Sequence, residues 1–348
     1  MSRTVPTSDL APARRYRGAI LGSGNIALHA HLPAFRETPG VRERVEIVAL
    51  VDGASTARVA GVPRLDDRDQ LSDLGPIDFI DICTPTATHL ELATWGLEQG
   101  YHVLCEKPVA ISPGDATALR RLAGARGKVL VPCHQYRFNP AWRTLAQWLE
   151  AGRIGHWHLA EFAVYRQLAD PGAMRAPTPW RGSRRDSLGG VLLDHGTHLI
   201  YQLLDVAGLP HAVQAWTGRL RHGDYDVEDT ASLLFEYPER AATMLLTWAA
   251  ARRDNLVRFT GERGTIELVG GELRLDTGDA TERIDFSAQL QKTAYSGWFG
   301  RLFAEFVDAL DMGGADAALH DIARVATVLD LAYTAAETGC RQTPVLLV

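Results

Sequence analysis

The stretch AILGSGNIALHAHLPAF, residues 19–35, limits the possible folds more than any other part of the chain. A short apolar run leads into Gly22, Gly24 and Ala27, in the pattern G-x-G-x-x-A, and a helical run follows. In a strand-turn-helix unit the first glycine permits a tight turn, the second lets a pyrophosphate approach the backbone, and the small third residue allows close packing. The free N–H groups at the start of the helix attract phosphate oxygens. The stretch predicts a dinucleotide-binding turn in which the cofactor contacts Gly22, Gly24, Asn25, Ile26 and Ala27.

A carboxylate, Asp52, ends the second apolar run, VEIVALVD. At this place in a dinucleotide-binding fold, a carboxylate accepts a hydrogen bond from a ribose 2′-hydroxyl and repels a 2′-phosphate. The first cation after it is Arg58, which could still turn toward a phosphate. Asp52 therefore predicts NAD as the cofactor in preference to NADP. An ordinary residue of a strand-end turn is the alternative interpretation.

Short apolar runs alternate with helical runs in the first third of the chain. A helix over residues 88–100 ends on Gly100, a residue that suits a helix C-terminus. The predicted strands are residues 17–24, 45–52, 77–85, 101–108 and 128–134. Apolar strands that alternate with helices predict an N-terminal doubly wound α/β domain, whose parallel sheet is covered on both faces.

After a further helix in residues 138–155, the rhythm changes to short strands joined by hairpin-like connections such as YPER and GERG. The predicted strands are residues 156–167, 212–221, 229–237, 241–250, 255–261 and 264–270, and the predicted helices are 297–312 and 317–338. This pattern predicts a C-terminal α+β domain with a large open, mainly antiparallel sheet. We expect a flexible tail over 1–15, a dinucleotide-binding domain over 16–138, and a substrate-binding and oligomerisation domain over 139–348.

The composition indicates which partners the chain has. Its formal net charge of −6 gives no general attraction to nucleic acid or to anionic membranes. No apolar run of about 18 residues is present that would span a bilayer, and the N-terminus lacks the apolar segment of a secretory signal. The four cysteines have no close pairing, which fits a reducing compartment. We expect a cytoplasmic protein that binds small molecules, and neither nucleic acid nor membrane.

Glu106, Lys107 and Pro108 end the fourth predicted strand, at the carboxyl end where open α/β sheets bind ligands. A lysine here is either a solvated strand-end residue or a group placed in the ligand cleft. In the cleft it could exchange a proton beside a bound nicotinamide, and Glu106 would offer a hydrogen-bond acceptor to the lysine or to the cofactor ribose.

The stretch LLDHGTHLI, residues 192–200, places Asp194, His195 and His198 in an apolar helical run. Buried polar groups need partners, because burial without a hydrogen bond costs free energy. Asp194 and His198 are four residues apart and share one helix face, whereas His195 points roughly a quarter turn away. The residues alone leave three interpretations open: a catalytic acid-base pair, a metal site, and hydrogen-bonded core residues. A metal site would need at least one more ligand, which the nearby sequence does not supply, so no metal is expected.

The chain resembles the glucose-fructose oxidoreductase, inositol dehydrogenase and MocA family (Gfo/Idh/MocA). The similar stretches run in family order from about residue 17 to 338, and they are GSGNIA, VDG, DICTPTATHLELATWGLEQGYHVLCEKPVA, GGVLLDHGTHLIYQLLDVAG, VEDTASLLFEY and GERGTIEL. The resemblance implies a Rossmann domain followed by an α+β domain. It also implies that Lys107, Asp194 and His198 are catalytic and converge on the substrate carbinol beside the nicotinamide. Either His198 or Lys107 then takes the hydroxyl proton, and His195 keeps a structural interpretation.

The resemblance implies further site residues on both sides of the cleft. Those expected to bind the cofactor are Thr84, Pro85, His89, Glu106 and Lys107. Those expected to bind the substrate are Tyr136, Arg137, Asn139, Trp180, Arg181, Asp194 and His198. Arg184 and Arg185 are equally compatible with solvated positions. Tyr201 departs from the family's H-x-x-D pattern, in which many relatives carry an acidic residue; the departure concerns substrate identity and leaves the hydride chemistry untouched.

The function that the resemblance implies is an NAD-dependent oxidoreductase that interconverts a secondary alcohol and a ketone on a sugar, cyclitol or related polyol. Two alternatives stay open. One is a redox-neutral enzyme that holds NAD tightly, oxidises a glycoside transiently, and then eliminates or hydrolyses it. The other is a non-catalytic dinucleotide sensor. Because a broad open sheet usually needs covering, a homodimer or homotetramer through the C-terminal sheet is expected.

Overall fold

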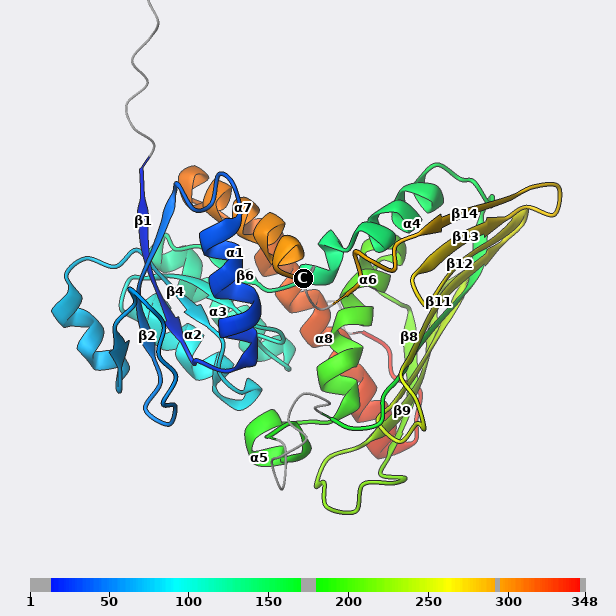
Figure 1. The fold of residues 1–348 in the computed structure, drawn as a ribbon. Helices are drawn as coiled ribbons and strands as arrows, with labels where there is room; N and C mark the ends of the chain where they lie inside the picture. Colours follow the sequence, from blue (N-terminus) through cyan, green and yellow to red (C-terminus); the bar gives the residue numbers. More distant parts are fainter. Residues whose placement is uncertain (1–13, 170–179, 292–294, 345–348) are drawn as a thin grey trace, which may run out of the picture.

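The computed structural model describes residues 14–169, 180–291 and 295–344. Nearly all of the tail expected over residues 1–15 lies outside the described residues. Two sheets make up the molecule, and helices lie between them (Figure 1). The predicted fold class, a doubly wound parallel domain followed by an α+β domain with a large open sheet, is confirmed.

Six parallel strands form the first sheet, in the order β3-β2-β1-β4-β5-β6. The strands are β1 Tyr16–Leu21, β2 Val45–Val51, β3 Arg64–Leu65, β4 Phe79–Ile82, β5 His102–Cys105 and β6 Leu130–Pro132. The two-residue β3 has no counterpart among the predicted strands. The strand order reverses between β1 and β4, and ligands of open α/β sheets bind at the carboxyl ends of the strands at such a reversal.

Apolar clusters lie on both faces of this sheet, and helices complete each of them. The helices are η1 Ala27–His31, α1 Leu32–Glu37, η2 Arg68–Leu74, η3 Thr86–Thr88, α2 His89–Glu98 and α3 Pro113–Arg126. Local chemistry sets the ends of α3. The Ser112 hydroxyl accepts a hydrogen bond from the Asp115 N–H, and Gly127 ends the helix with a φ of 59°.

Eight strands form the second sheet, in the order β14-β13-β12-β11-β7-β10-β9-β8. They are β7 Trp157–Tyr165, β8 Ala212–Gly218, β9 Thr230–Glu236, β10 Ala241–Thr247, β11 Asp254–Gly261, β12 Gly264–Val269, β13 Glu272–Asp276 and β14 Thr281–Asp285. All neighbours are antiparallel except β7 and β10. Strands β13 and β14 were not predicted, because their sequence is rich in charges and β14 is a largely exposed edge strand.

Helices cover one face of the second sheet and leave the other face open (Figure 1). The helices of this part are η4 Gln135–Phe138, α4 Pro140–Glu150, η5 Trp180–Gly182, α5 Arg184–Ser187, η6 Leu192–Gly196 and α6 Thr197–Ala207. Trp142, Leu145 and Trp148 follow a helical spacing on α4 and are buried in the core with residues of the sheet. The stretch LLDHGTHLI forms η6 and the first turn of α6, so the predicted helix is confirmed.

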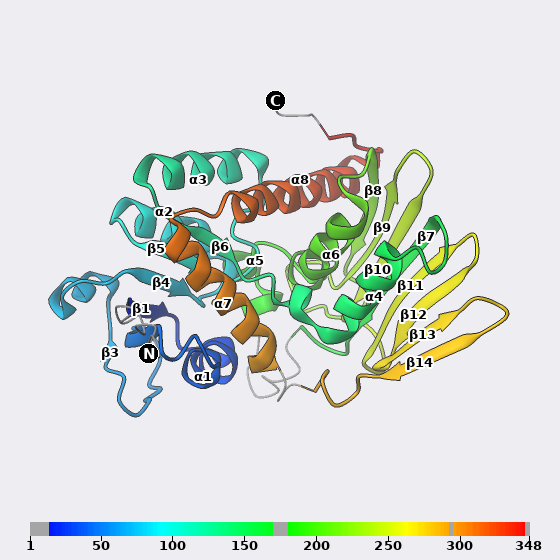
Figure 2. The same ribbon diagram turned by 90° about the horizontal axis from the view of Figure 1, so that it is seen from above.

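Two long helices, α7 Tyr295–Met312 and α8 Asp316–Thr338, end the fold. Helix α7 packs on α1 and buries Phe299, Phe303 and Phe306 in the core of the first sheet. Helix α8 reaches from α3 to β8 (Figure 2) and contributes to the cores of both sheets. The division of domains at residues 138 and 139 stays a prediction, and part of the chain after it packs on the first domain. No helix of the described residues is both long and apolar enough to cross a bilayer.

Candidate active site

The dinucleotide turn excludes a side chain at Gly22 and has open space at Gly24. Gly22 has a φ of +90°, and a Cβ there would lie 2.8 Å from the carbonyl oxygen of Cys83. Gly24 is exposed, and no atom lies within 4 Å of the place where its Cβ would be. The first hydrogen bond of the helix runs from the Leu28 N–H to the Gly24 carbonyl oxygen, at 3.1 Å. The N–H groups before Leu28 are therefore not used in the hydrogen bonds of the helix. The turn therefore fits a dinucleotide phosphate.

Asp52 organises this turn through hydrogen bonds to both of its carboxylate oxygens. Its Oδ2 accepts hydrogen bonds from the Ser23 N–H at 2.8 Å and the Ser23 hydroxyl at 2.9 Å. Its Oδ1 accepts from the N–H groups of Ala54 and Ser55 at 3.1 and 3.0 Å. Burial alone would raise the pKa of Asp52, but these hydrogen bonds hold the pKa below its ordinary value. The carboxylate stays ionised, as a group that repels a 2′-phosphate must.

His31 lies between two buried carboxylates beneath the carboxyl ends of β4 and β5. Its Nδ1 is 2.8 Å from Asp81 Oδ2, and its Nε2 is 3.0 Å from Glu106 Oε1. A neutral imidazole has one N–H, so contacts to two carboxylates need the protonated ring. Burial alone would lower the pKa of His31, but the charge of Asp81 raises it well above the ordinary value. A buried imidazolium therefore holds Glu106.

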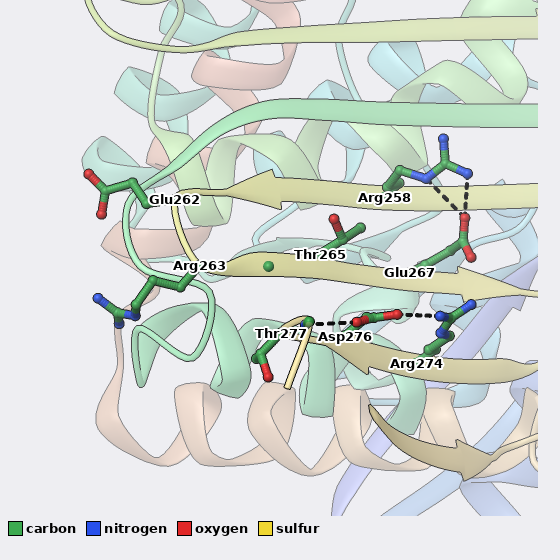
Figure 3. A pocket seen from close by; sticks show the side chains of 10 residues that line it. Arg258, Glu262, Arg263, Thr265, Glu267, Arg274, Asp276 and Thr277 are labelled. Carbon is green, nitrogen blue, oxygen red and sulfur yellow. Dashed lines mark hydrogen bonds and ion pairs between the residues drawn. The ribbon is translucent and has the colours of Figure 1, made fainter. Parts of the chain in front are cut away.

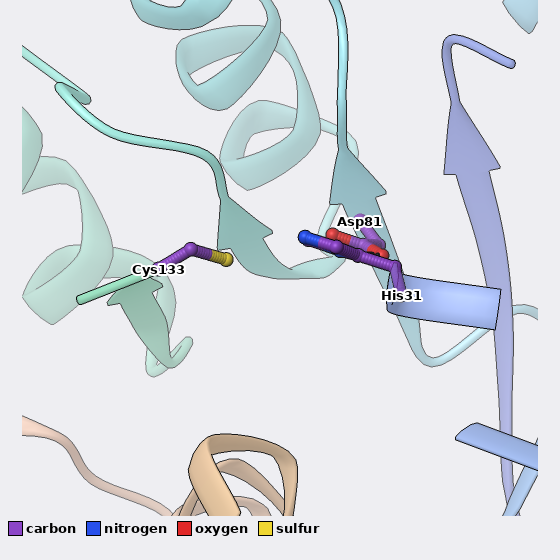
Figure 4. A group of neighbouring side chains, drawn as sticks. All are labelled: His31, Asp81 and Cys133. Atoms are coloured by element: carbon purple, nitrogen blue, oxygen red, sulfur yellow. Dashed lines mark hydrogen bonds and ion pairs between the residues drawn. The ribbon is translucent and has the colours of Figure 1, made fainter. Parts of the chain in front are cut away.

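The thiol of Cys133 lies beside this histidine (Figure 4). Ligand atoms of His31, Asp81 and Cys133 lie within 4.8 Å of one another, a spacing that a metal site would share. Hydrogen bonds account for the group without an ion, because both ring nitrogens already face carboxylate oxygens. Burial also raises the pKa of Cys133 well above its ordinary value, so the thiol keeps its proton.

Lys107 joins the first domain to the helix that carries LLDHGTHLI. Its Nζ donates to the Asp194 carbonyl oxygen at 2.7 Å and to Asp194 Oδ1 at 2.8 Å. The side chains of Lys107 and Asp194 are 9% and 19% exposed, so little solvent screens the pair. Two of the three Nζ hydrogens are used in these bonds, which leaves one for a ligand.

Asp194 has a second cation and a histidine at its other oxygen. Arg181 Nε lies 3.2 Å from Asp194 Oδ2. His195 Nδ1, 3.4 Å from the same oxygen, accepts a hydrogen bond from the Trp248 indole N–H at 3.3 Å. Burial lowers the pKa of His195 to about 3, so this ring is neutral. Burial would raise the pKa of Asp194, but Lys107 and Arg181 hold it well below its ordinary value.

His198 is a buried, neutral ring packed among aromatic side chains. Burial, together with the charge of Lys107, lowers the pKa of His198 well below its ordinary value. Its ring lies 4.2 Å from the ring of Tyr136, and its Nδ1 is 2.9 Å from the Tyr201 hydroxyl. Its Nε2 has no hydrogen-bond partner among residues 14–169, 180–291 and 295–344, so this nitrogen is available to a ligand.

Glu228, which sequence reasoning did not single out, holds the start of η6. Its Oε1 accepts hydrogen bonds from the N–H groups of Gly190 and Leu192 at 2.8 and 3.3 Å and from the Tyr333 hydroxyl at 2.8 Å. Burial raises the pKa of this carboxyl group. A Cβ on Gly190 would lie 1.8 Å from the Glu228 carbonyl oxygen, so only glycine allows this approach.

We expect Gly190→Ala to destabilise the protein by about 1–3 kcal/mol or more. The added methyl group would overlap the backbone of Glu228, which cannot move freely. The displaced helix start should also lower turnover. Thermal unfolding and initial rates measure both effects. Gly124→Ala is the matched control, since its Cβ meets no atom within 4 Å on α3, and alanine there should be neutral or slightly stabilising. An unchanged Tm in Gly190→Ala would contradict the expected strain.

Family descriptions match both parts of the chain. The description "Oxidoreductase family, NAD-binding Rossmann fold" matches residues 16–134, and "GFO/IDH/MocA C-terminal domain" matches residues 142–267. The chain belongs to the Gfo/Idh/MocA family of oxidoreductases. Among curated members of similar sequence, the uncharacterized oxidoreductase YdgJ of Escherichia coli (strain K12) is 27% identical, over 79% of this chain and 78% of the relative.

Two further relatives of this Gfo/Idh/MocA protein carry names that state a substrate or ligand. D-glucoside 3-dehydrogenase of Escherichia coli (strain K12) is 28% identical over 56% of this chain and 54% of the relative. The chain thus spans about half the length of that relative. The solved structure of levoglucosan dehydrogenase in complex with NADH and L-sorbose has a TM-score of 0.82 at 20% identity. That likeness covers 95% of this chain and 99% of the other, and it shows a shared fold.

Not every residue that the family resemblance assigned to a ligand is free to meet one. Arg137 forms ion pairs with Asp205 on α6 and Asp321 on α8. Asn139 is the N-cap of α4 and accepts a hydrogen bond from the Ala141 N–H at 2.9 Å. These two residues link elements of the fold, and their expected contact with the substrate stays a prediction.

His89 and Glu106 are likewise turned into the protein. His89 places Nδ1 2.8 Å from the Pro108 carbonyl oxygen and Nε2 2.9 Å from the Thr84 carbonyl oxygen, so it holds the loop that carries Thr84 and Pro85. Glu106 faces His31 and is 7% exposed. Trp180 lies against Arg181, whose Cζ is 4.4 Å from the centre of the indole. Residues 170–179 of the expected substrate loop lie outside the described residues.

Proposed function

We propose that this protein is an NAD-dependent oxidoreductase that interconverts a secondary alcohol and a ketone on a sugar, cyclitol or related polyol. The observation that carries the proposal is the ion pair between Lys107 and Asp194. It joins the carboxyl end of β5, two strands from the dinucleotide turn, to the helix of the second domain. The names of D-glucoside 3-dehydrogenase and of the levoglucosan dehydrogenase complex support the substrate class.

The side chains of the site have complementary tasks in this reaction. When bound, the nicotinamide supplies the hydride acceptor or donor. Lys107 offers one N–H to the reacting oxygen, and Asp194 keeps the lysine oriented through two hydrogen bonds. His198 presents its Nε2 from a ring that Tyr136 and Tyr201 hold in place. Arg181 balances the charge of Asp194. The hydroxyl proton passes to His198, or to Lys107 once its ammonium group has released a proton to solvent.

The fate of the cofactor distinguishes the proposed dehydrogenase from a redox-neutral enzyme. A net dehydrogenase forms one NADH for each alcohol oxidised, whereas an enzyme that oxidises a glycoside transiently restores NAD in each cycle. We expect stoichiometric NADH from added NAD. Product formed with a constant amount of NAD would favour the redox-neutral enzyme. A dinucleotide sensor would bind NADH and turn over none of the sugars, cyclitols or other polyols offered.

Asp52 leads us to propose NAD as the preferred cofactor. Arg58 is exposed, and the cation in contact with Asp52 is Arg64, which donates to its carbonyl oxygen at 2.9 Å and pairs with Asp66. We expect NAD to bind at least about tenfold more tightly than NADP, because an ionised carboxylate repels the 2′-phosphate. Titration of the protein with both cofactors measures the ratio. A clear preference for NADP would contradict this assignment.

We propose that the open face of the second sheet is covered in a homodimer or homotetramer. Strand register places four exposed apolar residues on this face, and they are Leu159, Trp216, Leu245 and Val269. A shallow hollow of about 500 Å³ lies on the same face (Figure 3). There Arg258 pairs with Glu161 and Glu267 across neighbouring strands. Apolar residues beside side chains of both charges suit contact with a second copy of the chain.

Substituting glutamate on this face should dissociate the oligomer. We expect Leu245→Glu combined with Trp216→Glu to give a monomer by light scattering, because association would bury two unpaired charges. Met312→Glu, at a 77% exposed position on α7, is the control and should leave the mass unchanged. A wild-type protein that is already monomeric would refute the proposed interface.

We also propose that the enzyme works in the cytoplasm. All four cysteines are free thiols, and Cys83, Cys105 and Cys133 are buried. Unpaired thiols of this number are typical of a reducing compartment.

A further inference from the structure

The surroundings of Tyr201 assign its hydroxyl hydrogen. The side chain is fully buried. Its oxygen accepts a hydrogen bond from the Tyr136 N–H at 3.0 Å and lies 2.9 Å from His198 Nδ1. Within the described parts of the chain these are its two hydrogen-bond partners.

A hydroxyl group has one hydrogen to donate. If His198 Nδ1 carried the ring proton, it would donate to Tyr201, and the oxygen of Tyr201 would accept twice while its own hydrogen had no acceptor. A buried donor without a partner costs about 1–3 kcal/mol. If Tyr201 donates to Nδ1 instead, the Tyr201 hydroxyl hydrogen and the Nδ1 lone pair are both paired, and Nε2 carries the ring proton. An acidic residue at position 201 would reverse this arrangement, because a carboxylate can only accept and would draw the proton to Nδ1.

We infer that Tyr201 is a positioning residue that fixes His198 as the tautomer with its proton on Nε2. The neutral ring then presents an N–H donor, rather than a lone pair, to the ligand side of the site. Together with the N–H that Lys107 keeps beside its two bonds to Asp194, it gives the resting site a second donor. Such a site binds a carbonyl or alkoxide oxygen. The Nε2–H of His198 has no lone pair for the proton of an alcohol substrate, and Lys107 takes that proton only after its ammonium group has released one to solvent.

This inference rests on the proposed function for its chemical consequence, but the tautomer is measurable without any turnover. The experiment is long-range ¹H–¹⁵N correlation NMR on full-length protein labelled with ¹⁵N-histidine, near neutral pH and without ligand. The signals of His198 are identified by their loss in His198→Gln. We expect a nitrogen of the unprotonated type at Nδ1 and one of the protonated type at Nε2. The opposite pattern would overturn the inference.

The role of Tyr201 is tested by Tyr201→Phe, which keeps the ring that stacks 4.2 Å from His134 and removes only the hydroxyl group. We expect the Nδ1 resonance of His198 to shift, because this nitrogen loses its hydrogen-bond donor. Tyr16→Phe removes a hydroxyl bound to Asp311 in the first domain and should leave the His198 signals unchanged. Unchanged Nδ1 signals in Tyr201→Phe would overturn the role of Tyr201. Should that variant fail to fold, the wild-type spectrum alone decides the tautomer.

The outcome is separable from that of the proposed function. If no polyol is oxidised but the Nε2 tautomer is observed, the proposed function fails and the assignment of the hydroxyl hydrogen stands. If turnover is observed with the Nδ1 tautomer, the proposed function stands, His198 has a lone pair for the alcohol proton, and the inference is wrong.

Discussion

We expect Lys107→Gln to lower turnover by about 10²–10⁴-fold, the usual contribution of a group that transfers a proton in the transition state. Glutamine keeps a polar side chain of similar length but can neither carry the charge that pairs with Asp194 nor exchange a proton. Because the dinucleotide turn lies on β1 and η1, the variant should bind NADH with nearly the wild-type affinity. Initial rates and a fluorescence titration with NADH measure the two quantities.

Lys128→Gln provides a matched control for this substitution. Lys128 lies between α3 and β6 in the first domain, and no hydrogen bond or ion pair of its side chain is present among the described residues. We expect turnover within about twofold of wild type in the control. Equal losses of turnover in both variants, or wild-type turnover in Lys107→Gln, would contradict a role for Lys107 in the reaction.

The second large effect is expected at His31. Replacing it by glutamine leaves Asp81 and Glu106 buried near each other without the cation between them. Removing one partner of a buried ionic network typically costs about 3–5 kcal/mol, because the remaining charge stays desolvated. We expect a loss of stability of that order in denaturant unfolding. His29→Gln, at an exposed position of the same helix, is the control and should be close to wild type.

The loss in His31→Gln should depend on pH in a defined direction. The pKa of His31 is raised in the folded protein, mainly by Asp81 against the effect of burial. Its contribution to stability is therefore complete below the unfolded pKa near 6.5 and is lost as pH rises through the folded pKa. The difference between wild type and variant should shrink above pH 6.5, by up to about 1.4 kcal/mol per pH unit. A difference that grows with pH would contradict a protonated His31.

The sequence predicted the dinucleotide turn and the convergence of Lys107 and Asp194 on one site, for different reasons. Gly22 and Gly24 act through local backbone geometry, which a motif of a few residues determines. The pair of Lys107 and Asp194 links residues 87 positions apart. It was expected only because the resemblance to a known family placed both side chains at one substrate.

Contacts within the protein could not be predicted in the same way. The sequence cannot show that Arg137 pairs with Asp205 and Asp321, or that Asn139 caps a helix. The network of His31, Asp81 and Glu106 was also missed, although the burial of a histidine in an apolar helical run was a signal for it. In each case a polar side chain bonds to another group of the protein, and tertiary packing determines which group that is.

The most direct test of the proposed reaction offers wild-type protein NAD and a panel of sugars, cyclitols and other polyols deuterated at the carbinol carbons. Absorbance and mass spectrometry then follow the reduced cofactor. We expect at least one member to give one reduced nicotinamide per ketone formed, with the deuterium on the nicotinamide, and no such product with Lys107→Gln. Reduced cofactor without deuterium, the same yield from Lys107→Gln, or binding of NAD with no reduction by any member of the panel would contradict hydride transfer from a polyol carbinol at this site.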